Sequence, residues 1–166
     1  MSRFLLVCLL LVCNLTLCGA RNTAAAKRYA FSSAAAQLPN DILPESGVII
    51  VTPNDQYAWR VGAGGKIEYS FDSSHTWELQ KSGVTVDLIG GWAPSVKICW
   101  VFGKEGTILL TTDQGKHWKK IPCPLKEDVA GIFAQDAKRA SIWSASHKQS
   151  FETNDGGATW APNVNK

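Results

Sequence analysis

The chain has 166 residues, with 17 basic and 14 acidic side chains and a formal net charge of +3. This charge is ordinary, and no basic cluster is larger than the one at Lys116–Lys120. The composition therefore gives no support for nucleic-acid binding.

The N-terminal segment 1–20 has the pattern of a secretory signal peptide. Arg3 precedes the apolar run 4–17, and small residues follow as far as Ala20. The run is shorter than the ~20 residues that a membrane-spanning helix needs. We expect cleavage after Ala20 and export to the periplasm or the exterior. The alternatives are a lipid anchor on Cys18 and retention as an uncleaved membrane anchor.

The segment 21–45 is predicted to form a flexible linker. It is rich in small and polar residues and has no sustained apolar period. Pro39 and Pro44 interrupt the approach to the first repeat.

A short phrase, which occurs three times, organises the rest of the chain. The copies are 70–77, 111–118 and 153–160, and their aspartates and tryptophans recur at a nearly constant interval. A fixed period of about 40 residues is typical of repeat architectures, in which each unit stacks on a neighbour to bury its apolar face.

Each repeat also predicts four β-strands. The first strands are expected at 47–52, 84–89 and 129–134, and a hairpin of β-branched and aromatic residues follows each of them. A short fourth strand follows each phrase, as at 118–121. Four strands in a period of about 40 residues match a propeller blade. We therefore predict an all-β fold with three four-stranded blades, at about 46–82, 83–124 and 127–164.

The phrase has a structural interpretation of its own. Its aspartate can accept hydrogen bonds from its own turn, its glycine permits a positive φ, and its tryptophan returns apolar surface to the sheet. Six of the seven tryptophans occupy equivalent places and are expected to pack between strands and blades, and only Trp92 lies outside the scheme. The predicted structural residues are Asp72, Trp77, Asp113, Gly115, Trp118, Asp155, Gly157 and Trp160.

The pattern Ser/Thr-x-Asp-x-Gly-x-Thr-Trp resembles the Asp box of BNR repeats, which in that family forms the turn between the third and fourth strands of a propeller blade. Ser74 and His117 depart from the pattern. The stretch 103–118 is similar to the photosystem II stability and assembly factor-like branch of these propellers. The resemblance covers residues 46–164 and implies a non-catalytic scaffold for protein interaction or assembly. Because BNR repeats also occur in sialidases, the alternative is a glycan-binding or degenerate sialidase-like module.

We predict that the protein is not an enzyme. A sialidase-like site would need three arginines on the substrate carboxylate, whereas only Arg60 and Arg139 lie in the repeats. The neighbouring carboxylates Glu127 and Asp128 are expected in a loop between blades rather than in an acid/base pair. We predict no cofactor and no metal site. A calcium ion on the phrase aspartates is the alternative to carboxylates that are satisfied by their own turns.

Cysteines and blade number leave alternatives open. Cys99 and Cys123 are expected on the second and fourth strands of one blade, as two separate buried thiols or, alternatively, as a disulfide. Three blades are fewer than the roughly 4–8 of closed propellers, so the end blades are expected to expose apolar faces. The alternatives are a six-bladed ring of two chains, a partner protein on the ends, an open arc and a remnant of a longer gene. We predict association with itself or with a protein partner through the exposed blade ends.

Overall fold

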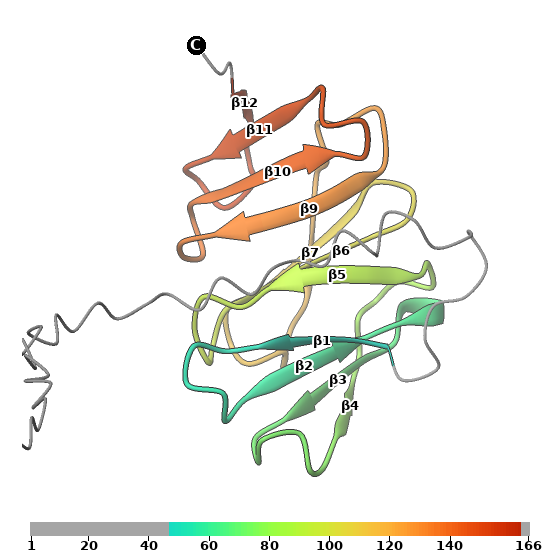
Figure 1. Ribbon diagram of the computed structural model, residues 1–166, viewed down its shortest axis with the longest axis vertical. Helices are drawn as coiled ribbons and strands as arrows, with labels where there is room; N and C mark the ends of the chain where they lie inside the picture. Colours follow the sequence, from blue (N-terminus) through green and yellow to red (C-terminus); the bar gives the residue numbers. More distant parts are fainter. Residues whose placement is uncertain (1–46, 164–166) are drawn as a thin grey trace, which may run out of the picture. The chain divides into compact units, whose positions relative to one another are not determined.

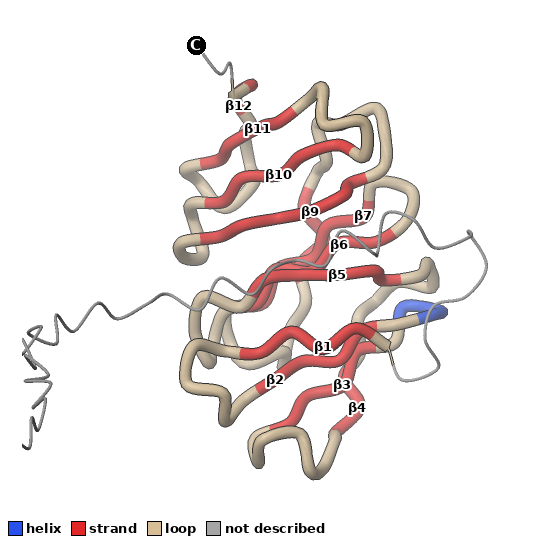
Figure 2. Tube along the Cα trace, viewed as in Figure 1, coloured by secondary structure: helices blue, strands red, loops and turns tan. Residues whose placement is uncertain are grey.

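The strands of the repeats form three separate four-stranded antiparallel sheets. A computed structural model describes residues 47–163, which lie in one compact unit. Each sheet is a meander, because its strands pair in chain order (Figures 1 and 2). The predicted all-β fold of three propeller-type blades is confirmed. The expected signal peptide and linker lie outside the described residues.

The three blades have the same order of elements. Blade 1 comprises β1 (Val48–Val51), β2 (Ala58–Val61), β3 (Ile67–Ser70) and β4 (Glu78–Gln80), with a 3-10 turn, η2, at Ala63–Gly65. Blade 2 comprises β5 (Leu88–Trp92), β6 (Cys99–Gly103), β7 (Thr107–Thr111) and β8 (Lys119–Ile121). Blade 3 comprises β9 (Val129–Ala134), β10 (Ala140–Ser144), β11 (Ser150–Thr153) and β12 (Ala161–Pro162). The first strands contact one another, β1 with β5 and β5 with β9 (Figure 1). Across residues 47–163, no helix has the length and hydropathy needed to cross a bilayer.

The position of β5 differs from the prediction, which put the first strand of blade 2 at 84–89. The pair Gly90–Gly91 resembles a turn, but it lies within β5 because neighbouring groups approach it closely. A Cβ at Gly90 would lie 2.6 Å from the Phe102 ring, and a Cβ at Gly91 would collide with the Trp100 carbonyl oxygen. The strand therefore extends to Trp92. This tryptophan was expected outside the repeat, but it pairs with Trp100.

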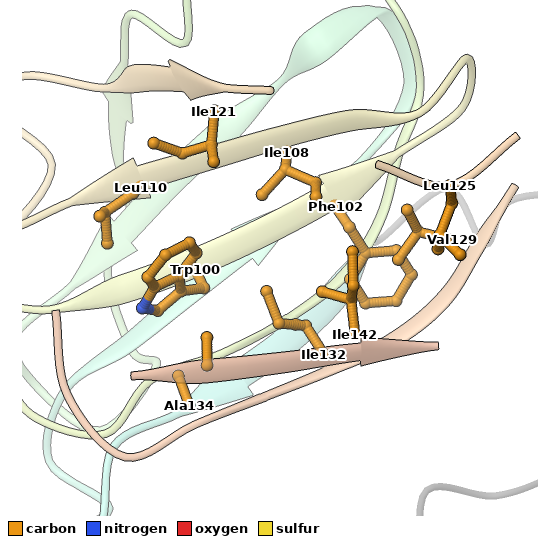
Figure 3. Close-up of a cluster of buried hydrophobic side chains, with 11 residues drawn as sticks. Trp100, Phe102, Ile108, Leu110, Ile121, Leu125, Val129, Ile132, Ala134 and Ile142 are labelled. Atoms are coloured by element: carbon orange, nitrogen blue, oxygen red, sulfur yellow. The ribbon is translucent and has the colours of Figure 1, made fainter. Parts of the chain in front are cut away.

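Two apolar cores lie at the two junctions between blades. The core between blades 1 and 2 contains Trp59 from β2 and Val101 from β6. The core between blades 2 and 3 is formed by Trp100, Phe102, Ile108, Leu110 and Ile121 on one side and by Leu125, Val129, Ile132, Ala134, Ala140 and Ile142 on the other (Figure 3). Every residue of β6 and β7 is buried, because blade 2 is covered on both faces. Each fully buried large side chain contributes about 1.5–3 kcal/mol to folding.

Two tryptophans at equivalent positions of blades 1 and 2 differ in their hydrogen bonding. Trp59 and Trp100 are both 0% exposed. The Trp100 Nε1–H donates to the Asp136 carbonyl oxygen of blade 3 at 3.0 Å. The Trp59 Nε1 has no hydrogen-bond partner, and it is the only such buried side-chain nitrogen or oxygen within residues 47–163.

The two cysteines of the blades are free thiols on opposite sides of blade 2. Cys99 lies in the core between blades 1 and 2, whereas Cys123 packs against the core between blades 2 and 3. The alternative of a disulfide between them is therefore wrong for this structure. The prediction of two buried thiols also needs correction, because Cys123 follows β8 and is only half-buried.

Candidate interaction surface

The three phrase copies fold into one kind of turn between the third and fourth strands, and we call 70–77, 111–118 and 153–160 the aspartate turns. In the third turn, the Thr153 hydroxyl donates to Asp155 Oδ1 at 2.8 Å and accepts from the Gly157 N–H at 2.9 Å. The Thr159 N–H donates to Asp155 Oδ1 at 2.9 Å, and its hydroxyl donates to Oδ2 at 2.6 Å. Both carboxylate oxygens thus accept hydrogen bonds from within the turn.

The second turn keeps this geometry with a different residue. His117 replaces the threonine, and its ring Nδ1 lies 2.7 Å from Asp113 Oδ2. The backbone N–H of His117 donates to Asp113 Oδ1 at 3.0 Å. The Thr111 hydroxyl bonds to Asp113 Oδ1 and to the Gly115 N–H in the same way as in the third turn. A histidine ring nitrogen therefore serves where the repeat expects a hydroxyl.

Hydrogen bonds lower the pKa of each turn aspartate to about 2. For Asp72 and Asp155, the hydroxyl of the threonine that precedes the turn tryptophan has the largest effect, followed by the backbone N–H of the same threonine. For Asp113, burial raises the pKa, but hydrogen bonds from the side chain and backbone of His117 outweigh it. These carboxylates are ionised and satisfied by their own turns. Within residues 47–163, no group of three His, Cys, Asp or Glu side chains is arranged to hold a metal ion.

The second and third aspartate turns also attach each blade to the one before it. The Trp118 Nε1–H donates to the Gln80 side chain at 3.2 Å, and the Trp160 Nε1–H donates to the Pro122 carbonyl oxygen at 2.8 Å. A Cβ at Gly115 would collide with the Gln80 side-chain amide, and a Cβ at Gly157 would collide with Ile121. Glycine supplies a positive φ at both positions, and at Gly157 it also leaves room for Ile121 of the preceding blade.

The first aspartate turn has no preceding blade among the described residues, and it departs from the other two. Ser74 occupies the glycine position with a φ of 70°. Trp77 contacts its own blade, because the Arg60 guanidinium lies 4.4 Å from the centre of its ring. The predicted structural residues thus all lie in the three turns, and the first turn has a different environment.

The hairpin between β9 and β10 matches its counterpart in blade 2, because Val129 pairs with Ser144 as Leu88 pairs with Gly103. Trp143 was expected at the place of Trp59 and Trp100, but it lies at the place of Phe102, since it pairs with Gly131 as Phe102 pairs with Gly90. Phe133, which pairs with Ser141, therefore takes the place that Trp92 has in blade 2.

The equivalent residues Trp92 and Phe133 form an aromatic pair at the surface. Phe133 is 43% exposed, and its ring centre lies 5.0 Å from that of Trp92 at an interplanar angle of 58°. Beside Phe133 is a shallow depression of about 90 Å³, lined mostly by polar residues. We call these residues together the hairpin surface: Trp92, Phe133, Gln135, Arg139, Ser141, Glu152 and Asn154.

Hydrogen bonds hold the tip of the β9–β10 hairpin in place. The Asp136 side chain accepts from the backbone N–H groups of Lys138 and Arg139, each at 2.8 Å, and from the Arg139 guanidinium. These bonds, the two backbone ones first among them, lower the pKa of Asp136 to about 2. The Asp136 carbonyl oxygen accepts the bond from Trp100, so the tip is fixed to blade 2. The hairpin surface is therefore preorganised.

The two arginines of the repeats do not come together. Arg60 is paired with Glu68 in blade 1, and Arg139 is paired with Asp136 in blade 3. The sequence reasoning missed the hairpin surface, because it placed Trp92 outside the repeat. Strand spacing gives no signal for it, since β9 ends at Ala134 and β10 begins at Ala140, whereas β5 ends at Trp92 and β6 begins at Cys99.

The first strands of the three meander sheets contact one another, and each sheet has an aspartate turn between its third and fourth strands. These features define a protein built of β-propeller blades. Among solved structures, the chain is similar to YCF48 bound to D1 peptide, with 23% identity and a TM-score of 0.62 over 75% of this chain and 42% of that chain. It is similar to YCF48 from Cyanidioschyzon merolae, with 24% identity and a TM-score of 0.62 over 75% and 39%. It is also similar to the GH74 xyloglucanase from Xanthomonas campestris, with 14% identity and a TM-score of 0.59 over 75% and 24%.

These likenesses establish the fold. The chain spans about two fifths of the length of the YCF48 structures. The predicted resemblance to assembly factor-like BNR propellers is confirmed at the level of the fold. No protein-family model matches the sequence, and a comparison with curated proteins gives no match.

Proposed function

We propose that this protein is an exported, non-catalytic propeller scaffold that binds a peptide segment of a protein partner at the hairpin surface. The observation that carries the proposal is the contact of the exposed Phe133 on β9 with Trp92 on β5, beside a polar depression. The fold it shares with a YCF48 structure that contains a D1 peptide supports a peptide as ligand. The N-terminal sequence pattern supports export.

The chemistry of the hairpin surface suits a protein ligand. Half-exposed aromatic rings anchor protein interfaces, because they bury a large area at a small cost in side-chain entropy. The polar residues Gln135 and Asn154 line the depression beside Phe133 and can pair with the backbone of a bound segment. Because the hairpin tip is already fixed to blade 2, binding loses little further conformational freedom.

The ionised groups support a non-catalytic role. The carboxylates with the lowest pKa values, those of the aspartate turns and Asp136, are held by hydrogen bonds within their own turns. Arg60 and Arg139 are each engaged by a neighbouring carboxylate on different blades. None of these groups faces a second one in the manner of an acid/base pair.

A peptide selection with two matched variants tests the proposal. Peptides selected from a random library against the full chain are measured by fluorescence anisotropy with wild type, Phe133→Ser and the control Phe71→Ser. Phe71 is exposed to a similar degree, 48% against 43%. We expect Phe133→Ser to weaken binding by at least about 10-fold, as for an interface anchor, and Phe71→Ser to leave it within about 2-fold. Binding that is insensitive to Phe133→Ser would contradict the proposal.

A glycan is the second candidate ligand, and one observation favours it. Trp92 and Phe133 offer aromatic faces beside Glu152 and Asn154, which can bond to sugar hydroxyls, and the fold is also that of a xyloglucanase. A glycan array probed with the same two variants separates the candidates. Glycan binding that is lost with Phe133→Ser, without any selected peptide, would favour the second.

A further inference from the structure

The face of blade 1 that is turned away from blade 2 has an unusual composition, and we call it the leading face. One row of cross-strand partners runs across it: Ile49 on β1, Arg60 on β2, Glu68 on β3 and Leu79 on β4. The Arg60 Nε–H donates to Glu68 Oε2 at 2.6 Å, and Lys66 Nζ lies 3.0 Å from Glu68 Oε1. The centre of the leading face is therefore an ion-pair network.

Blade 2 has apolar residues at the same positions. Val101 and Leu109 take the places of Arg60 and Glu68 in the second repeat, and both belong to the core between blades 1 and 2. At an internal junction this row thus packs against the preceding blade. The Glu68 side chain is only 12% exposed, and the hydrogen bond from Arg60 holds its pKa below the usual value. A blade docked here would have to cover an ionised pair with apolar surface, which is unfavourable.

The first aspartate turn departs from the internal junctions in two further ways. Trp118 and Trp160 donate their indole N–H groups to the preceding blade, whereas Trp77 lies against the Arg60 guanidinium of its own blade. This cation–π contact gives the ring a partner within blade 1. The position that is a glycine close to the preceding blade at both internal junctions is Ser74 here. Each change removes a feature that the internal junctions use to receive a blade.

We infer that the leading face is a built-in end of the blade stack, which excludes docking of another propeller blade, including blade 3 of a second copy of this chain. End repeats of stacked proteins carry a polar outer face for this purpose. The apolar surface expected on blade 1 is present only in part, because Ile49 and Leu79 are exposed at opposite ends of the charged row. The inference depends on the geometry of blade 1 alone and not on the proposed function.

To test this inference, the charged pair of the leading face is replaced by the apolar residues found at an internal junction. Light scattering coupled to size exclusion measures the mass of the full chain and of the double variant Arg60→Val with Glu68→Leu, over a wide range of concentration. A control, Lys119→Val with Glu78→Leu, makes comparable changes from charged to apolar side chains at exposed positions on the edge strands β8 and β4. We expect the mass of one chain for wild type and control, and at least twice that mass for the double variant. A folded double variant that keeps the mass of one chain at every concentration would overturn the inference.

A second measurement needs no change to the ion pair. Leu79→Cys places a thiol at a position that is 73% exposed on the leading face. Its rate of alkylation by a charged reagent, followed by mass spectrometry of the peptide, reports whether this face is covered. We expect a rate that does not depend on protein concentration. Protection that increases with concentration, together with a dimer mass for wild type, would show that the leading face is an interface.

Discussion

The two equivalent tryptophans allow the value of one hydrogen bond to be measured within a single protein. Replacing Trp59 or Trp100 by phenylalanine removes the same atoms at equivalent, fully buried positions of blades 1 and 2, so the packing losses are similar. Trp100→Phe also removes the bond to the Asp136 carbonyl oxygen. Trp59→Phe removes a buried N–H that has no partner. We therefore expect Trp59→Phe to destabilise the protein less than Trp100→Phe does.

The size of the difference follows from two contributions. A typical hydrogen bond contributes about 0.5–1.5 kcal/mol to stability, and an unsatisfied buried donor costs about 1–3 kcal/mol. The first is lost with Trp100→Phe, and the second is relieved with Trp59→Phe. The free energies of unfolding of the two variants should thus differ by about 1.5–4.5 kcal/mol.

Urea unfolding followed by circular dichroism measures this difference, provided that both variants keep the wild-type m-value. The order of the two midpoints decides the outcome. Equal midpoints, or a lower midpoint for Trp59→Phe, would refute the reasoning, because the indole N–H of Trp59 would then be as well satisfied as that of Trp100.

Two further predictions concern pH and thiol chemistry. Folding lowers the pKa of the turn aspartates from 3.8 to about 2, so the unfolded state binds more protons between these pH values. The stability that these aspartates give to the folded protein is therefore complete above about pH 3.8 and is lost as the pH falls toward 2. Asp155→Asn should flatten the dependence of the urea midpoint on pH in this interval, whereas the exposed-residue control Glu127→Gln should leave it unchanged, and equal slopes would count against the turn bonds as its cause. Burial raises the pKa of the Cys99 thiol well above its usual value and raises that of the half-buried Cys123 thiol by a smaller amount. Alkylation of the folded protein should therefore modify Cys123 first and Cys99 only on unfolding, as measured by peptide mass spectrometry. A Cys99–Cys123 disulfide peptide from the native protein would contradict the placement of the two thiols on opposite sides of blade 2.

The aspartate turns were predictable because their chemistry is local. Thr153, Asp155 and Thr159 lie in one short segment, and all the bonds that define the turn are made inside it. The second turn shows the same principle, since His117 supplies a ring nitrogen at the position of the threonine hydroxyl.

The position of β5 and the hairpin surface were not predictable in the same way. Gly90 and Gly91 have the composition of a turn, and only the close approach of Phe102 and Trp100 shows why a strand needs them. The contact between Trp92 and Phe133 joins residues of two blades, and no short-range pattern encodes it.

The polar composition of the leading face could have been predicted from the sequence. Aligning the repeats puts Arg60 and Glu68 at the places of Val101 and Leu109. The apolar row of blade 2 indicates a strand covered on both faces, and the charged row of blade 1 indicates a strand with one face uncovered. The prediction of apolar end faces treated the repeats as identical.

The meander order of the sheets has a consequence for how the fold can form. Within the described residues, strand pairing joins only neighbouring parts of the chain, and the most widely separated partners are Leu88 with Gly103 and Val129 with Ser144. Strand pairing therefore needs no distant part of the chain, and the entropy of loop closure is lost in small steps, one hairpin at a time. Side-chain packing, the bonds of the aspartate turns and a few further bonds, such as those from Leu88 to Gly62 and from Trp100 to Asp136, link one blade to the next. Each folded blade thus offers the next one a surface on which to pack.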